Sequence, residues 1–220
     1  MGQLRQCSPA TAFMLACMRR VDRQFLPPLT GGISALRQES KLTRASPHMT
    51  VHDYNGTGPW AAGAVLKRYA ELARRFHVEP PADLTPLETQ DRGVRWIYPV
   101  MERVNEAIEQ NDPAAIEIGI EFIQSDDHFP FGKILKSNTA RALRRAALCA
   151  GQIHRIRRRV LQMLVDGRVP HEYKEYAKLL RKIGLGSDWP EVAAKVDQTN
   201  PRAMRYSRYF TEHATQSGSA

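Results

Sequence analysis

The chain has few of the residues on which disulfide frameworks and metal sites depend. It contains 3 cysteines in 220 residues, with no Cys-x-x-Cys pair and no histidine partners at metal-site intervals. This composition is typical of free thiols in a reducing compartment. The sequence also has no apolar run that approaches the roughly 18 residues of a membrane-spanning helix. We therefore expect a cytoplasmic protein without a membrane span.

Sequence signatures of common catalytic sites are absent as well. The run Gly184-Leu185-Gly186-Ser187 lacks the additional glycine and the lysine of a phosphate-binding loop. No Gly-x-Ser-x-Gly elbow is present, and Cys149 has no base beside it in the sequence. We therefore favour a non-enzymatic protein, and we expect no cofactor and no catalytic residue.

Signals for β-strands are scarce, whereas helical periodicity recurs along the chain. No segment sustains a period-two alternation with β-branched residues, so we predict an all-α fold. Helices of about 12–17 residues joined by short loops favour antiparallel neighbours. Two architectures fit: an irregular helical bundle, or a short stack of antiparallel helical hairpins like that of HEAT-like arrays. A stack would leave an internal repeat of about 35–45 residues, and the sequence shows no recognisable one.

The clearest helix start is Asp112-Pro113, because a carboxylate caps the first turn and proline suits the first helical position. Thr85-Pro86-Leu87-Glu88 has the form of a capping box and predicts another start. From there, a helix interrupted at Gly93 and Pro99 would extend to Gln110. The other predicted helices cover residues 60–77, 131–147, 153–164, 173–183 and 188–198.

Both ends of the chain differ from its middle in composition. Residues 1–48 carry seven bases and two acids, and they supply +5 of the formal net charge of +9. We interpret them as a basic, disordered extension or as a segment upstream of the true start at Met49. Residues 49–198 are predicted to form a single all-helical domain, and residues 199–220 a flexible tail. The basic and aromatic tail residues suit either stacking on single-stranded bases or docking on the core: Arg202, Arg205, Tyr206, Arg208, Tyr209 and Phe210.

The most informative feature is a reversal of charge in the middle of the chain. From Glu102 to Asp127 there are eight acidic residues and one base, whereas from His128 to Val165 there are nine Lys and Arg residues and no acid. If the basic helices are neighbours, their cations converge on one face that can neutralise phosphates without reading a base sequence. The predicted contact set for a nucleic-acid backbone consists of Lys133, Lys136, Arg141, Arg144, Arg145, Arg155, Arg158 and Arg159.

The basic block can be satisfied in two other ways. It can pair with the acidic stretch 102–127, in the same chain or in a second copy, since consecutive helices tend to lie side by side. It can also engage an acidic protein, because charge alone does not identify a partner. The sequence therefore predicts a helical interaction module whose partner is nucleic acid, an acidic protein or a second copy of the chain.

The acidic stretch ends in a group of oxygen ligands and an imidazole. Such groups can hold a divalent metal that activates water for phosphodiester hydrolysis. Their spacing matches no metal motif, and Asp126 and Asp127 equally suit the N-terminus of the next helix. We therefore assign no metal ligand, and the third hypothesis is a metal-dependent nuclease that uses Glu117, Glu121, Asp126, Asp127 and His128.

Overall fold

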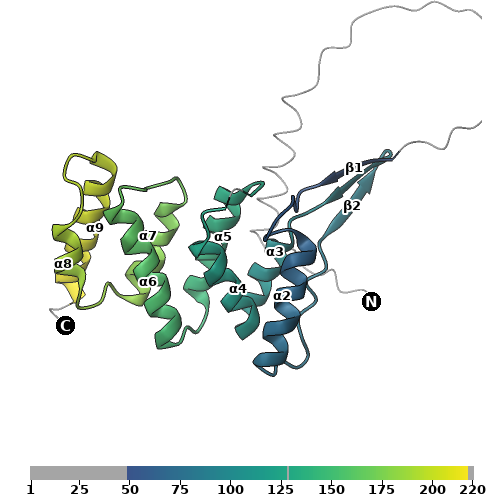
Figure 1. The fold of residues 1–220 in the computed structure, drawn as a ribbon, viewed down its shortest axis with the longest axis horizontal. Coiled ribbons are helices and arrows are strands. Elements are labelled where there is room, and N and C mark those ends of the chain that lie inside the picture. The colour runs from purple at the N-terminus through teal and green to yellow at the C-terminus, as the bar shows by residue number, and fades with distance from the viewer. Residues whose placement is uncertain (1–48, 128, 218–220) are drawn as a thin grey trace, which may run out of the picture. The chain divides into compact units, whose positions relative to one another are not determined.

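The computed structural model describes residues 49–127 and 129–217, which contain eight helices and one three-stranded sheet (Figure 1). The prediction of a mostly helical protein is confirmed, but the prediction that the chain has no sheet is wrong. The extension predicted for residues 1–48 lies outside the described residues, and so does His128. Within the described ranges, no helix is long and apolar enough to cross a membrane.

The helices arise where the periodic apolar pattern predicts them. Asp112 caps α4 as expected, because its Oδ1 accepts hydrogen bonds from the backbone N–H groups of Ala114 (2.8 Å) and Ala115 (3.0 Å). Pro113 is the first residue of that helix. The helices are α2 (Ala62–Arg75), α3 (Val100–Glu109), α4 (Pro113–Gln124), α5 (Gly132–Arg145), α6 (Ala150–Val165), α7 (Tyr173–Ile183), α8 (Trp189–Ala194) and α9 (Pro201–Ser217).

The sheet consists of three four-residue strands, β1 (Thr50–Asp53), β2 (Glu88–Asp91) and β3 (Val94–Ile97), in the order β1-β3-β2. β1 runs parallel to β3, and β2 runs antiparallel to it. Only Arg92 and Gly93 connect β2 to β3, and both have positive φ angles, 46° and 79°. Two such residues form the turn that matches the twist of a tight hairpin.

The helix predicted from the capping box at residues 85–88 is therefore wrong. Glu88 instead begins β2 and pairs with Ile97 at the end of β3. The hairpin satisfies backbone groups by pairing with a neighbouring strand, which outweighs a capping signal that depends on four residues. The helix predicted to continue to Gln110 begins only at Val100, immediately after Pro99.

A buried asparagine joins the sheet to the helices. Asn55 is 2% exposed, and its side-chain amide donates hydrogen bonds to Asp53 Oδ1 (2.9 Å) and to the carbonyl oxygen of Tyr98 (3.1 Å). Its own Oδ1 accepts a hydrogen bond from the backbone N–H of Val100 at 2.7 Å. This N–H opens α3 and has no partner within the helix, so Asn55 ties the start of α3 to the end of β1.

Every second helix packs against the next but one in the chain. α2 contacts α4 and α4 contacts α6, while α3 contacts α5 and α5 contacts α7 (Figure 1). α4 also contacts both α3 and α5, so its side chains are enclosed on several sides. Fully buried side chains between these helices include Phe122, Leu135, Ile156 and Tyr176.

The segment predicted as a flexible tail contains a helix, α9. Asn200 precedes α9, and its Oδ1 accepts hydrogen bonds from the backbone N–H groups of Arg202 (3.1 Å) and Ala203 (3.2 Å). Phe210 is 1% exposed, and its ring centroid lies 5.5 Å from that of Trp189 on α8. The apolar side of α9 thus docks on the core, which was the other expectation for these residues.

Candidate functional site

Five of the eight predicted contact residues form ion pairs with carboxylates of the same chain. Four of the acids come from the acidic stretch or the loop after it, and the fifth, Glu175, lies on α7. Lys136 donates instead to the backbone carbonyl of Ser125, and Lys133 and Arg158 are exposed. The pairs are Arg141–Glu175 (3.4 Å), Arg144–Glu175 (3.4 Å), Arg145–Glu109 (2.5 Å), Arg155–Glu117 and Arg159–Asp126.

The hypothetical metal ligands are likewise held by separate partners. Glu117 accepts hydrogen bonds from Arg155 and Gln152, and Glu121 lies 3.5 Å from Arg68 Nε. Asp127 accepts a hydrogen bond from the Ser125 hydroxyl at 2.7 Å. Among residues 49–127 and 129–217, no three His, Cys, Asp or Glu side chains are grouped so that they could hold a metal ion.

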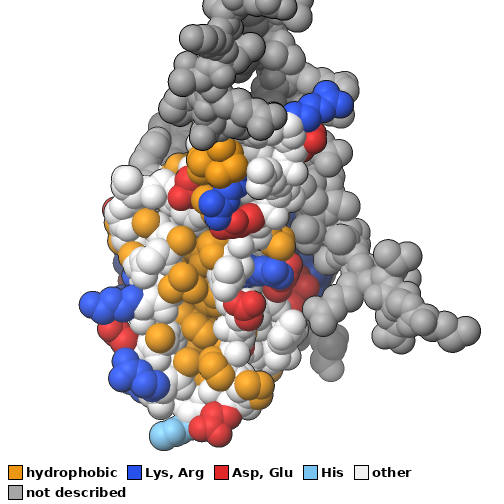
Figure 2. All heavy atoms as spheres, turned by 90° about the vertical axis from the view of Figure 1, so that its right-hand side faces the viewer, with side chains coloured by type: hydrophobic (Ala, Val, Ile, Leu, Met, Phe, Trp, Pro, Cys, Tyr) orange, Lys and Arg blue, Asp and Glu red, His pale blue; other side chains and the backbone are white. Residues whose placement is uncertain are grey.

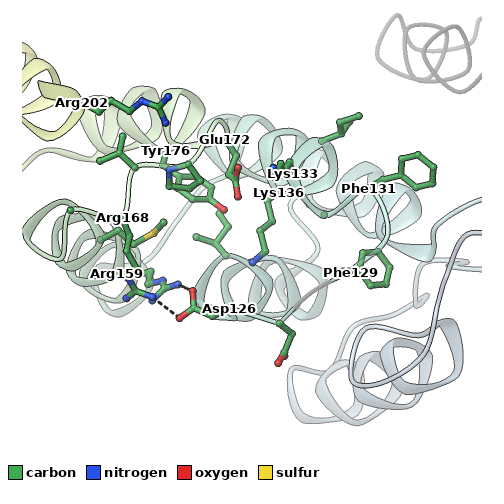
Figure 3. A pocket seen from close by; sticks show the side chains of 18 of the residues that line it. Asp126, Phe129, Phe131, Lys133, Lys136, Arg159, Arg168, Glu172, Tyr176 and Arg202 are labelled. Atoms are coloured by element: carbon green, nitrogen blue, oxygen red, sulfur yellow. Dashed lines mark hydrogen bonds and ion pairs between the residues drawn. The ribbon is translucent and has the colours of Figure 1, made fainter. Parts of the chain in front are cut away.

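A hollow of about 810 Å³ lies where the α4–α5 loop, α5, α6, the α6–α7 loop and the start of α9 meet (Figure 3). Three predicted contact residues, Lys133, Lys136 and Arg159, meet there, and the other five lie outside its lining. Two further arginines complete its cations. Altogether five cations face three carboxylates: Lys133, Lys136, Arg159, Arg168 and Arg202 against Asp126, Asp127 and Glu172.

Asp126 positions two of these arginines. Its carboxylate accepts hydrogen bonds from Arg159 and, at 2.9 Å, from Arg168, whose other terminal nitrogen lies 2.8 Å from Asp166. The hydrogen bond from Arg159, together with that from Arg168, lowers the pKa of Asp126 below its usual range. Both guanidinium groups are therefore held in place at the hollow, as the close-up shows (Figure 3).

The lining of this first hollow contains buried polar atoms that lack a partner within the described part of the chain. Glu172 is 8% exposed and its Oε2 makes no hydrogen bond, and the same holds for the buried Nε of Arg159. Lys136 is half-buried, and this burial lowers the pKa of its ammonium group against the opposing effect of Glu172. Because buried polar atoms are nearly always hydrogen-bonded, such atoms mark a place where a polar ligand or water can bind.

A second hollow, of about 630 Å³, adjoins the first and shares Val169, Pro170 and Arg202 with it. Its described lining contains four Lys and Arg residues and no carboxylate. Lys178 is paired with Glu175 at 3.0 Å, whereas Lys174 and Arg205 are exposed. We call the two hollows together the basic groove, and its eight cations are Lys133, Lys136, Arg159, Arg168, Lys174, Lys178, Arg202 and Arg205.

The sequence predicted part of this groove. Arg202 and Arg205 belong to the predicted tail set, in which Tyr206 and Tyr209 also line the second hollow. Arg168, Glu172, Lys174 and Lys178 were not predicted, because they follow the basic block and stand among acids. The spacing of Lys174 and Lys178, one helical turn apart on α7, is the local signal that could have found two of them.

Comparisons with models of protein families, with curated proteins and with solved structures find no match for this chain. Its function is therefore inferred from the positions, charges and burial of its own residues.

Proposed function

We propose that the chain is a non-enzymatic helical interaction module that binds the phosphate backbone of a nucleic acid along the basic groove. The architecture proposed for it is a short stack of antiparallel helical hairpins. The contacts of α2 with α4 and α6 on one side, and of α3 with α5 and α7 on the other, support this arrangement. Stacked hairpins characteristically form extended binding surfaces along a row of helices.

The observation that carries the proposal is the lining of the second hollow. Four cations line it without a carboxylate among its described residues, although the chain pairs five of the eight cations first predicted. Arg202, shared by both hollows, continues the positive lining into the first one. A row of cations along a groove is suited to successive phosphates, because each neutralised phosphate releases bound counterions.

Tyrosines among these cations distinguish nucleic acid from a general acidic partner. Tyr206 and Tyr209 line the second hollow next to Arg202 and Arg205. Proteins that bind single strands without sequence preference combine a cationic groove with aromatic side chains. An acidic protein would require the cations but not the tyrosines, so we favour nucleic acid over an acidic protein.

The test is fluorescence anisotropy of a labelled oligonucleotide with the full chain across a series of salt concentrations. We compare the wild type with Lys174→Ala/Arg205→Ala, which removes two exposed cations of the second hollow. We expect the affinity at moderate salt to fall on the order of tenfold, and the salt dependence (the slope of log K against log salt concentration) to become shallower by about 1.4 for a single strand.

The matched control is Lys67→Ala/Arg181→Ala, which removes the same charge from exposed positions on α2 and α7 outside the groove. Residues 1–48 are present in all three proteins, so their charge contributes equally. Equal losses in both double variants would show that net charge, and not the groove, binds the oligonucleotide. That result would remove the proposal.

A second candidate function, contact with another protein molecule, is favoured by an apolar surface on α2. Apolar side chains form a strip over this end of the described helices (Figure 2). A hollow of about 640 Å³ lies there, lined by Leu66, Ala70, Val78 and Pro81 among others, and Leu66 is 36% exposed. The end helices of a stack need a polar outer face for solubility, so an apolar one indicates a partner.

Sedimentation velocity over a range of protein concentrations tests this second candidate. If a second copy covers the α2 surface, the wild type should form dimers at high concentration, and Leu66→Glu should remain monomeric. Lys67→Glu, at the neighbouring exposed position, controls for the added negative charge. Monomers of the wild type at all concentrations would rule out self-association through this surface.

A further inference from the structure

Four aromatic side chains lie on one face of the small sheet. His52 on β1 is directly opposite Trp96 on β3 in the sheet register, and Tyr54 and Tyr98 follow two residues after each of them. Because successive side chains of a strand alternate between its faces, residues two apart share a face. The aromatic face of the sheet is therefore made of His52, Tyr54, Trp96 and Tyr98.

The rings of this face lie next to one another and nearly in parallel. The His52 ring centroid lies 6.3 Å from that of Trp96 and 6.5 Å from that of Tyr54, with 16° between the ring planes in both cases. The centroids of Tyr54 and Tyr98 are 6.3 Å apart. At these separations the rings are offset rather than stacked face to face, so together they form a wide aromatic surface.

Part of this surface is open to solvent. His52 is exposed and Trp96 is half-buried, whereas the two other tryptophans, Trp60 and Trp189, are 3% and 5% exposed. Aromatic side chains of this size usually contribute to a core when the fold can bury them. Here, all the residues of the two edge strands are exposed.

The aromatic face continues into the basic groove through Phe131. The ring of Phe131 stands edge-on to that of Tyr54, with centroids 5.2 Å apart and 85° between the planes. Phe131 also lines the first hollow next to Lys133 (Figure 3). Its φ of 57° is unusual for a bulky residue, and conformations of this kind are concentrated at functional sites. The unusual backbone thus occurs where the aromatic face meets the cations.

We infer that the aromatic face of the sheet stacks unpaired bases of a single-stranded nucleic acid whose phosphates lie in the basic groove. This inference rests on the proposed function and adds the kind of nucleic acid to it. Bases stack on exposed aromatic rings of a sheet only when they are splayed out of a helix, so the surface selects single strands over duplexes. An apolar protein segment would gain little from the cations adjoining Phe131, and charge complementarity therefore favours a nucleic-acid strand.

Tryptophan fluorescence provides a direct test, because Trp96 is the one accessible tryptophan among the three in the sequence. The full chain is titrated with a short oligothymidylate and, separately, with an abasic strand of equal length that has the same phosphates and no bases. We expect the oligothymidylate to quench the emission, and the abasic strand to bind more weakly and leave the emission unchanged. A duplex of the same length should not quench it either.

Substitutions then assign the effect to the aromatic face. Trp96→Ala should weaken oligothymidylate binding by about 5- to 150-fold, the factor expected for one lost base stack, and leave binding of the abasic strand unchanged. His52→Ala, at an exposed position, should act in the same direction without removing a buried group. Trp96→Phe, which keeps a ring, should retain most of the affinity. Gln90→Ala, at an exposed position of β2 opposite Arg95, is the matched control within the sheet.

The outcomes separate this inference from the proposed function. If both strands bind equally well and Trp96→Ala changes neither affinity, the stacking inference is wrong, while Lys174→Ala/Arg205→Ala can still show that the groove binds phosphates. If polyglutamate binds as tightly as the oligothymidylate and is insensitive to Trp96→Ala, the surface recognises charge alone and its partner is an acidic protein. If no strand binds at low salt, both the inference and the proposed function are overturned.

Discussion

Gly119 on α4 and Ile108 on α3 approach so closely that no side chain fits between them. A Cβ atom at position 119 would lie 2.6 Å from Ile108 Cδ1 and 3.2 Å from Thr139 Cγ2 of α5. Gly119→Ala should therefore lower the free energy of unfolding by about 1–3 kcal/mol, because a methyl group there forces the three helices apart. Urea denaturation followed by circular dichroism measures this loss.

The control for this prediction is Gly63→Ala, because Gly63 also lies in a helix but would place its Cβ in open space. This variant should be as stable as the wild type or up to about 1 kcal/mol more stable, since alanine favours the helix. Equal effects at both positions would show that helix propensity, rather than the close approach of α3, α4 and α5, decides the result.

Thr139 on α5 and Asn105 on α3 form a buried hydrogen bond between neighbouring helices. The Thr139 hydroxyl lies 2.8 Å from Asn105 Oδ1 and 3.0 Å from the carbonyl oxygen of Leu135, and both side chains are buried. Thr139→Val should destabilise the fold by about 1–3 kcal/mol, because it leaves Asn105 without this donor. Thr57→Val, at an exposed loop position, should change the midpoint of thermal unfolding little. A shift that is equally small for Thr139→Val would contradict the prediction.

The ion pair between Arg155 and Glu117 should contribute to stability, because it joins α6 to α4 and Glu117 is only 14% exposed. A double-mutant cycle with Arg155→Ala and Glu117→Gln should give a coupling free energy above about 1 kcal/mol. The same cycle for Lys195 and Glu191, whose side chains are 59% and 73% exposed, should give under about 0.5 kcal/mol.

This cycle also affects how binding data are interpreted. If Arg155 is mainly a structural partner of Glu117, Arg155→Ala should weaken oligonucleotide binding only in proportion to the unfolded fraction. A binding defect in the fully folded variant would place Arg155 in the interface after all. Coupling energies of similar size for the two pairs would contradict a structural role for the Arg155–Glu117 pair.

Glu102 on α3 makes the stability dependent on pH. Burial, and to a smaller extent the charge of Glu106, raises the pKa of Glu102 from 4.5 to about 7. In the unfolded chain this carboxyl ionises near pH 4.5, whereas in the folded protein it keeps its proton up to about pH 7. Raising the pH through this window therefore destabilises the folded state, and the loss persists above pH 7.

Glu102→Gln removes this titration and shows its sign. The variant should match the wild type in stability near pH 4 and exceed it at pH 8 by on the order of 1–2 kcal/mol, allowing for partial solvent screening. Thermal unfolding followed across this pH range measures the difference. Glu71→Gln, at an exposed position of α2, controls for the loss of one negative charge. A stability difference that is the same at both pH values would contradict the prediction.

The predicted helices were mostly right because their signals are local. Asp112 caps α4 through groups two and three residues away, and the apolar spacing of α6 and α7 indicates which side of each helix is buried. The sheet was missed because its pairing is not local. His52 pairs with Trp96, more than forty residues later, and strands of four residues are too short to show an alternating pattern. The clearest overlooked cue is Arg92-Gly93, the two-residue turn between β2 and β3.

The candidate site was predictable only in part for a similar reason. Lys133, Lys136 and Arg159 stand in the basic block, so the sequence identified them as cations of interest. Arg168 and Lys174 follow that block among acids, and no local pattern assigns them to the same surface. The basic groove forms because the α6–α7 loop and the start of α9 come to lie beside α5.

The sequence by itself determined the helical class, most helix positions and the reversal of charge near residue 128, because periodicity, caps and charge are properties of neighbouring residues. Only the tertiary structure decided which charges neutralise one another. Arg155 finds Glu117 from 38 positions away, and Arg145 finds Glu109 from 36. The packing of α4, α5 and α6 sets these pairs, and the cations that it leaves over line the groove. A linear charge pattern does not contain this information, since ion pairing depends on distances between helices that the fold alone creates.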